Sequence, residues 1–209
     1  MKENRETMAP VLAEAVDYHT YRELIENLLA ENKTTGPNQS EAMVQYTQMN
    51  HQRMARWDKR TQLSEETLGV LEAITHPQLW VIITEGWCGD AAHSVPVIAK
   101  MAESNPNIDL RLVLRDENPD FMDRHLTNGG KSIPKLVVLD GESHEQLWEW
   151  GPRPAPAQAM VMEYKALPDP PPYSEFVKNV QLWYSRDKTV RIQQEVAEGL
   201  RAITVPEVS

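Results

Sequence analysis

The alternation of apolar and polar positions predicts a sheet made of four strands. Residues 79–84 form a short continuous apolar run rich in β-branched side chains, which is typical of a strand buried on both faces. Two further apolar runs, residues 109–115 and 134–139, read as the second and third strands. Asp140-Gly141 is a two-residue hairpin signal, so residues 145–150 should form the returning strand. We expect the first three strands to be parallel and the fourth antiparallel.

Helical spacing surrounds this predicted sheet. Ser64 has the character of an N-cap, and the helix after it should end near His76-Pro77, because a residue before proline avoids the helical conformation. A helix carrying Val95 and Ile98 on one face should connect the first two strands. The remaining helices are expected around residues 21–28, 40–59, 121–126, 155–166 and, as one long element, 174–203.

These elements predict an α/β fold, with a central mixed sheet flanked by helices and additional helices at both ends. We divide the chain into an N-terminal helical extension (1–76), a core (77–167), and a proline-rich spacer with a C-terminal helix (168–209). Both extensions should pack on the core.

Composition narrows the possible partners. The net charge of −10 disfavours nucleic acid and anionic membranes, since both attract clustered Lys and Arg. No apolar run is long enough for a membrane span, and the first ten residues show no secretory pattern. The single cysteine cannot form an internal disulfide, so we expect a cytoplasmic protein.

The candidate chemistry lies in two short motifs. Trp87-Cys88-Gly89-Asp90-Ala91 stands between the first strand and the helix that follows it, and Ser132-Ile133-Pro134 opens the third strand. Together, in this order of elements, they resemble the thioredoxin superfamily over residues 79–166. The stretch from Arg115-Asp116 to Gly129-Gly130, followed by Ser132-Ile133-Pro134, also looks like a bacterial branch of this superfamily with added terminal helices.

The resemblance implies a thioredoxin-like fold, a cis peptide bond at Ile133-Pro134, and Cys88 as the catalytic thiol. The N-terminus of a helix favours a thiolate, which is the attacking species in disulfide exchange. The implied substrate-binding residues are Trp87, Gly89, Asp90, Ile133 and Pro134, and Ala91, Arg115, Lys131 and Ser132 are further residues that could line the site.

Three features depart from the family pattern. Ala91 replaces the second cysteine, and Ile82 stands where the family has a buried acid. Asp90 and Glu85 add negative charge that raises a cysteine pKa, whereas Lys131 and Lys135 could offset it. The sign of the net shift stays open.

Two hypotheses follow. In the first, the protein is a monothiol thiol–disulfide oxidoreductase that acts on protein or small-molecule disulfides, with glutathione or another outside thiol releasing the mixed disulfide. In the second, it is a redox-inactive binding module that recognises an extended peptide or protein partner. Neither needs a resident cofactor. The histidines lack metal-ligand spacing, and His93 is expected to be solvated. The oligomeric state stays open.

Overall fold

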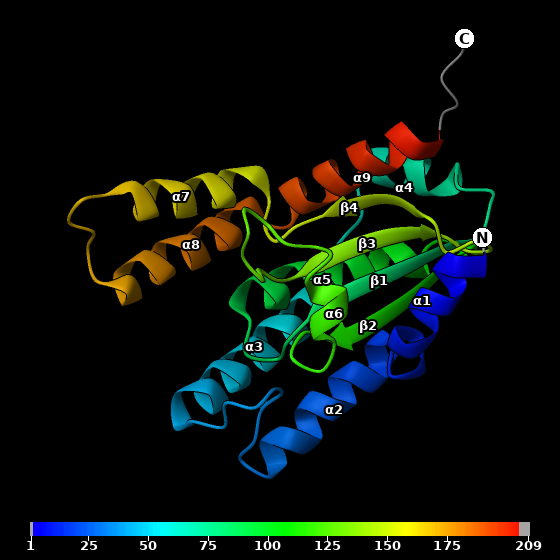
Figure 1. Ribbon diagram of the computed structural model, residues 1–209. Helices are drawn as coiled ribbons and strands as arrows, with labels where there is room; N and C mark the ends of the chain where they lie inside the picture. Colours follow the sequence, from blue (N-terminus) through cyan, green and yellow to red (C-terminus); the bar gives the residue numbers. More distant parts are fainter. Residues whose placement is uncertain (1, 205–209) are drawn as a thin grey trace.

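The computed structural model describes residues 2–204, and its centre is a four-stranded mixed sheet (Figure 1). The strands are β1 (Gln78–Thr84), β2 (Ile108–Leu114), β3 (Lys135–Asp140) and β4 (Gln146–Trp150), in the order β2-β1-β3-β4. Every residue of β1 is buried, as its continuous apolar run predicts. The strand is therefore central, and its C-terminal end leads directly into the cysteine motif.

The direction of β3 differs from the sequence prediction. β1 and β2 are parallel, but β3 is antiparallel to β1, with Val81 opposite Val137. A parallel crossover needs an element that carries the chain back along the sheet. The segment after β2 contains only the four-residue helix α6 (Pro119–Met122), so β3 starts near the end of the sheet where β2 finishes.

The hairpin between β3 and β4 exists, but its loop is longer than the predicted two residues. The Asp140 carboxylate accepts hydrogen bonds from the N–H groups of Glu142 (3.1 Å) and Ser143 (2.6 Å). The Asp140 N–H donates to the carbonyl of Glu145, which closes the loop. The side chain of Asp140, rather than a tight Asp-Gly turn, thus organises the connection.

Helices cover the sheet as the amphipathic spacing predicts. They are α1 (Lys2–Ala13), α2 (Tyr18–Ala30), α3 (Glu41–Arg60), α4 (Glu65–Glu72), α5 (Gly89–Glu103), α7 (Ala155–Ala166), α8 (Tyr173–Asp187) and α9 (Val190–Thr204). The largely buried α5 lies across one face of the sheet, whereas α6 lies in front of it in Figure 1. The segment between α1 and α2 pairs with the edge strand β2 through Val16 and Leu112, so part of that edge is covered.

Two helix ends differ from expectation. Ser64 caps α4 as predicted, but the helix ends at Glu72 because the buried Asn105 amide donates to the carbonyls of Leu71 (2.6 Å) and Ile74 (3.0 Å). The expected single C-terminal helix is two helices. Lys188, with a φ of 53°, ends α8, and the Asp187 carboxylate then accepts from the N–H of Arg191 in the first turn of α9.

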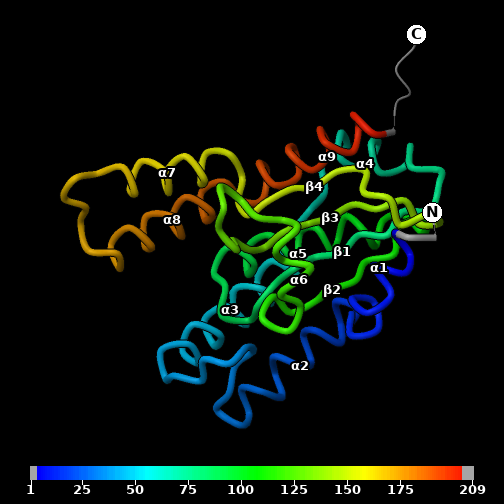
Figure 2. The backbone as a smooth tube through the Cα atoms, viewed as in Figure 1, coloured from blue at the N-terminus to red at the C-terminus, as the bar shows by residue number. Residues whose placement is uncertain are grey.

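The connection at residues 167–172 reverses the chain between α7 and α8, which form a hairpin that extends away from the sheet, as the tube in Figure 2 shows. The helices α9 and α4 pack against each other beside β4. No helix within residues 2–204 is both long and apolar enough to cross a membrane.

Candidate functional site

The cysteine motif forms the turn from β1 into α5. Cys88 is the N-cap residue of α5, and its N–H donates to the carbonyl of Glu85 (3.1 Å). Ile133 and Pro134 face it from the start of β3, joined by a cis peptide bond. The Cys88 thiol donates to the carbonyl oxygen of Ile133 at 3.4 Å, so the fold brings the two sequence motifs into direct contact.

The thiol of Cys88 is held in its protonated form. The residue is 7% exposed, and burial together with the nearby Asp90 carboxylate raises the pKa of the thiol to about 12. The N–H groups of Ala91 and Asp90 and the Arg153 guanidinium act in the opposite direction, but they do not outweigh burial. The helix N-terminus alone therefore does not produce a thiolate here.

Asp90 is a largely enclosed acid in the first turn of α5, with its side chain 13% exposed. Its carboxylate pairs with the Arg153 guanidinium at 2.8 Å and accepts a hydrogen bond from the Tyr184 hydroxyl at 2.9 Å. Burial raises the pKa of Asp90, and Arg153 opposes that shift. Asp90 thus joins the motif to the segment after β4 and to α8.

Arg153 is a site residue that the sequence reading missed. It lies in the stretch of alternating prolines, residues 151–156, which predicts only irregular structure. The Gly151-Pro152 bond just before it is cis. The one available signal was that Arg153 is the only charged residue in that stretch.

His93 is buried, so the expectation of a solvated histidine is wrong. One ring nitrogen accepts from the Trp57 indole N–H of α3 (2.8 Å), and the other lies 2.7 Å from the Gln181 side-chain oxygen of α8. The imidazole stacks on Tyr184 with ring centroids 4.3 Å apart. Burial lowers the pKa of His93 to about 4, so the ring is neutral at pH 7. This cluster joins α3, α5 and α8 around the motif.

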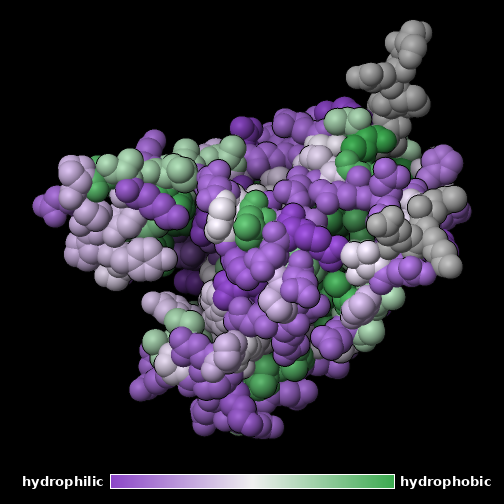
Figure 3. All heavy atoms as spheres, in the orientation of Figure 1, coloured by the Kyte–Doolittle hydropathy of each residue, from purple (hydrophilic) through white to green (hydrophobic). Residues whose placement is uncertain are grey.

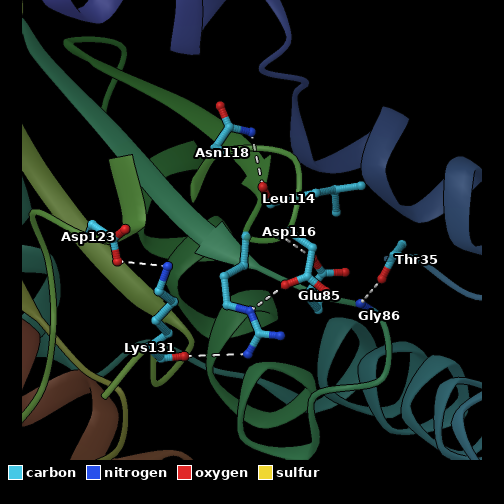
Figure 4. Close-up of polar contacts among 9 residues, drawn as sticks. Thr35, Glu85, Gly86, Leu114, Asp116, Asn118, Asp123 and Lys131 are labelled. Carbon is cyan, nitrogen blue, oxygen red and sulfur yellow. Dashed lines mark hydrogen bonds and ion pairs between the residues drawn. The ribbon is translucent and has the colours of Figure 1, made fainter. Parts of the chain in front are cut away.

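A second polar cluster lies on the β2 side of the motif (Figure 4). The Arg115 guanidinium stacks over the Trp87 ring at 4.7 Å and pairs with Asp116 at 2.8 Å. The fully buried Glu85 carboxylate accepts from the Asp116 N–H at 3.0 Å, and burial raises its pKa. A further bond joins Arg115 to the carbonyl of Lys131 (3.4 Å). Arg115 therefore links Trp87 to the loop that precedes Ile133.

The two lysines beside the cis peptide bond do not offset the acids near Cys88. Lys131 pairs with Asp123 at 2.7 Å, and Lys135 pairs with Glu149 at 3.0 Å. Among the neighbours that shift the thiol pKa, the cation is Arg153. Sequence proximity to the proline thus indicated the wrong basic residue.

The small residues of the motif are tightly enclosed. Ala91 is 1% exposed, and a side chain at Gly89 would meet the Gln181 amide at 3.1 Å. Ser132 is half-buried and donates its N–H to the carbonyl of Gly130. Within residues 2–204, no group of three or more His, Cys, Asp or Glu side chains is arranged to hold a metal ion.

Comparison with known proteins adds a family and two structural neighbours. A family model described as Thioredoxin matches residues 36–165. A protein of unknown function from Pseudomonas aeruginosa has a TM-score of 0.56 at 14% identity, covering 90% of this chain and 98% of that one. An HIV epitope-scaffold has a TM-score of 0.54 at 16% identity, covering 90% and 99%. A search of curated proteins finds no match. At such low identities the structural neighbours establish the fold alone.

Proposed function

Because this chain belongs to the thioredoxin family, we propose that it uses the family's fold as a binding module for an extended peptide of a partner protein, without redox turnover at neutral pH. The observation that carries the proposal is the state of Cys88. The residue is 7% exposed, its thiol donates to the Ile133 carbonyl, and burial raises the thiol pKa to about 12, well above the 9.0 of an ordinary cysteine, so Cys88 is protonated at pH 7. Nucleophilic attack on a disulfide needs that thiolate.

The surroundings of the thiol support the same proposal. Ala91 supplies no resolving sulfur, and Ile82 supplies no acid at the family's position. The largely enclosed Asp90 opposes ionisation of Cys88, and its own charge is taken up by Arg153 and Tyr184. In this arrangement Cys88 works as a small buried side chain that donates a hydrogen bond to Ile133.

The binding surface we propose begins beside this thiol. Trp87 is held by stacking against Arg115, and Ile133 is fixed in place by its contact with Cys88. An aromatic ring and a loop at the start of a strand offer an apolar contact and backbone hydrogen bonds to an extended peptide.

A monothiol oxidoreductase is the second candidate, and one observation favours it. Cys88 caps α5, and the N–H groups of Asp90 and Ala91 lower its pKa, as does Arg153. A conformation that exposed the sulfur would remove most of the burial that holds it protonated, and an outside thiol such as glutathione would then release the mixed disulfide.

Turnover separates the two candidates. Reduction of insulin disulfides is measured for the wild type, Cys88→Ser and Ala91→Cys, each with and without glutathione. We expect the wild type to match Cys88→Ser under both conditions, because neither has a usable thiolate. Ala91→Cys should gain little, since its second thiol does not lower the pKa of the first below neutrality. Glutathione-dependent turnover by the wild type that disappears in Cys88→Ser would establish the monothiol enzyme and overturn the binding module.

A further inference from the structure

Two helical arms flank the N-terminus of α5. The α7–α8 hairpin forms one arm, and α2 with α3 forms the other (Figures 1 and 2). The arms meet at the buried His93, which touches Trp57 of α3 and Gln181 of α8. Beyond this contact they separate, and Figure 3 shows a hollow between them. We name this hollow the α3–α8 cleft. It is defined by Tyr46, Met49 and Arg53 on α3, by Tyr173 and Gln181 on α8, and by Cys88 and Gly89 at its closed end.

The mouth of the α3–α8 cleft carries exposed apolar side chains. Tyr46 and Met49, three residues apart on α3, are each 42% exposed, and Tyr173 at the start of α8 is 66% exposed. Partial burial raises the pKa of the Tyr173 hydroxyl, and Arg153 opposes that shift. Charges on Asp90, Tyr46 and Cys88 also raise it, so the hydroxyl lies within electrostatic range of α3 and of the cysteine motif. Tyr and Met are enriched in the cores of protein interfaces.

Arg53, deeper in the cleft, has no carboxylate partner. No acidic side chain among residues 4–203 lies within ion-pair distance of its guanidinium, whereas Arg115 and Arg153 are each paired at 2.8 Å. Burial by itself lowers the pKa of Arg53, and no neighbouring acid opposes that shift. The protein therefore holds a half-buried positive charge that nothing in the described chain neutralises.

A fixed support positions this guanidinium. Its Nη1 donates to the side-chain oxygen of Asn50 at 2.8 Å, and the Asn50 amide donates to the carbonyl of Gly86 at 3.0 Å. Asn50 is 1% exposed, so it is itself fixed by packing. The same Nη1 lies 3.9 Å from the place where a side chain at Gly89 would begin. Arg53 is thus tied to the cysteine motif while part of its fork of N–H groups stays free.

We propose that the α3–α8 cleft binds a peptide segment of a partner protein in which a carboxylate pairs with Arg53. An apolar side chain of the same segment packs between Tyr173 and the exposed pair on α3. An arginine fork matches a carboxylate in geometry as well as charge, and pairing would offset the cost of keeping Arg53 half-buried. This inference rests on the proposed function, and it adds the class of peptide that is selected.

The test uses a phage library of random heptapeptides, selected on the full-length protein in reducing buffer. One enriched peptide is synthesised with a fluorescein label, together with a version in which its acidic residue is replaced by the matching amide. Dissociation constants are measured by fluorescence anisotropy for the wild type, Arg53→Gln, Arg53→Lys and Tyr173→Ser. The matched control is Arg111→Gln, which removes an arginine that pairs with Asp109 on the edge strand β2.

Enriched peptides should share an acidic residue next to an apolar one. Arg53→Gln and the amide peptide should each weaken binding about tenfold or more, and combining them should add little, since both remove the same charged pair. Arg53→Lys should recover part of the loss. Tyr173→Ser should weaken binding several-fold, and because this side chain is mostly exposed, that variant tests the cleft even if Arg53→Gln is unstable. Arg111→Gln should bind like the wild type.

Two results would overturn these proposals separately. Peptides that bind without an acidic preference, and equally well to Arg53→Gln and Tyr173→Ser, would refute the carboxylate site while leaving the binding module in place. Failure to enrich any peptide would refute the binding module itself.

Discussion

Replacing Asp90 with asparagine should lower the pKa of Cys88. The change removes a negative charge but keeps the size of a side chain that is only 13% exposed. At an effective dielectric constant of about 20, a unit charge on a neighbouring side chain is worth about 3 kcal/mol, which is about two pKa units. The pKa of the Cys88 thiol should therefore fall from about 12 toward 10. Arg153, then without its partner, shifts the pKa in the same direction.

Alkylation kinetics measure this shift, because Cys88 is the only cysteine. The rate of reaction with iodoacetamide is followed by mass spectrometry between pH 6 and 10. The wild-type rate should rise about tenfold per pH unit without a plateau, whereas Asp90→Asn should react about 100-fold faster at pH 8 and bend toward a plateau near pH 10. Asp109→Asn removes an exposed carboxylate on β2 and should leave the profile unchanged. An unchanged or higher pKa in Asp90→Asn would refute the electrostatic account of the protonated thiol.

Two further predictions concern stability and use chemical denaturation. Gly199→Ala should lower the free energy of unfolding by about 1–3 kcal/mol, because a methyl group there would overlap the Trp148 ring. Gly69→Ala in the neighbouring helix α4, where nothing lies within 4 Å, should raise it by about 0.5–1 kcal/mol, and equal effects of the two changes would contradict the packing of α9 on β4. Burial raises the pKa of Glu149, but hydrogen bonds and charge from His125 and Lys135 hold that pKa below the usual 4.5, so Glu149→Gln should lower the free energy of unfolding by about 2 kcal/mol at pH 7 after allowance for solvent screening. The difference between the two proteins should shrink as the pH falls below 4.5 and the wild-type carboxylate takes up a proton, and a pH-independent difference would contradict this account.

The sequence predicted the parts of the fold that depend on local pattern. The apolar run at residues 79–84 identified the central strand, and Ser64 identified the start of α4. The direction of β3 could not be predicted in this way, because an apolar strand has the same pattern in either direction. The direction of β3 depends on the length of α6, which is four residues, and the sequence pattern does not show where that helix ends.

The contacts around the thiol were harder to predict, since they join segments distant in the chain. The family resemblance placed Cys88 and the Ile133-Pro134 bond in one site, and the structure brings the thiol onto the Ile133 carbonyl. The sequence did not indicate that Arg153 would reach Asp90 across 63 positions, or that α8 would enclose His93. Neither contact leaves a periodic pattern, so local sequence analysis has no signal for them.

In the binding module that we propose, the residues that oppose redox chemistry also attach the C-terminal arm. A resolving cysteine at position 91 would need space and access, but Ala91 is enclosed. The Asp90 carboxylate disfavours ionisation of the Cys88 thiol. The same carboxylate pairs with Arg153 and accepts a hydrogen bond from Tyr184, and these two contacts join the C-terminal segment to the cysteine motif. If α8 docks through Asp90, a change that restored the thiolate by removing this acid would also loosen the arm. The lack of turnover that we propose at Cys88 and the cleft that we propose beside it then both depend on the Asp90 carboxylate. Asp90→Asn tests both at once, because it should raise the reactivity of the thiol and weaken peptide binding in the α3–α8 cleft.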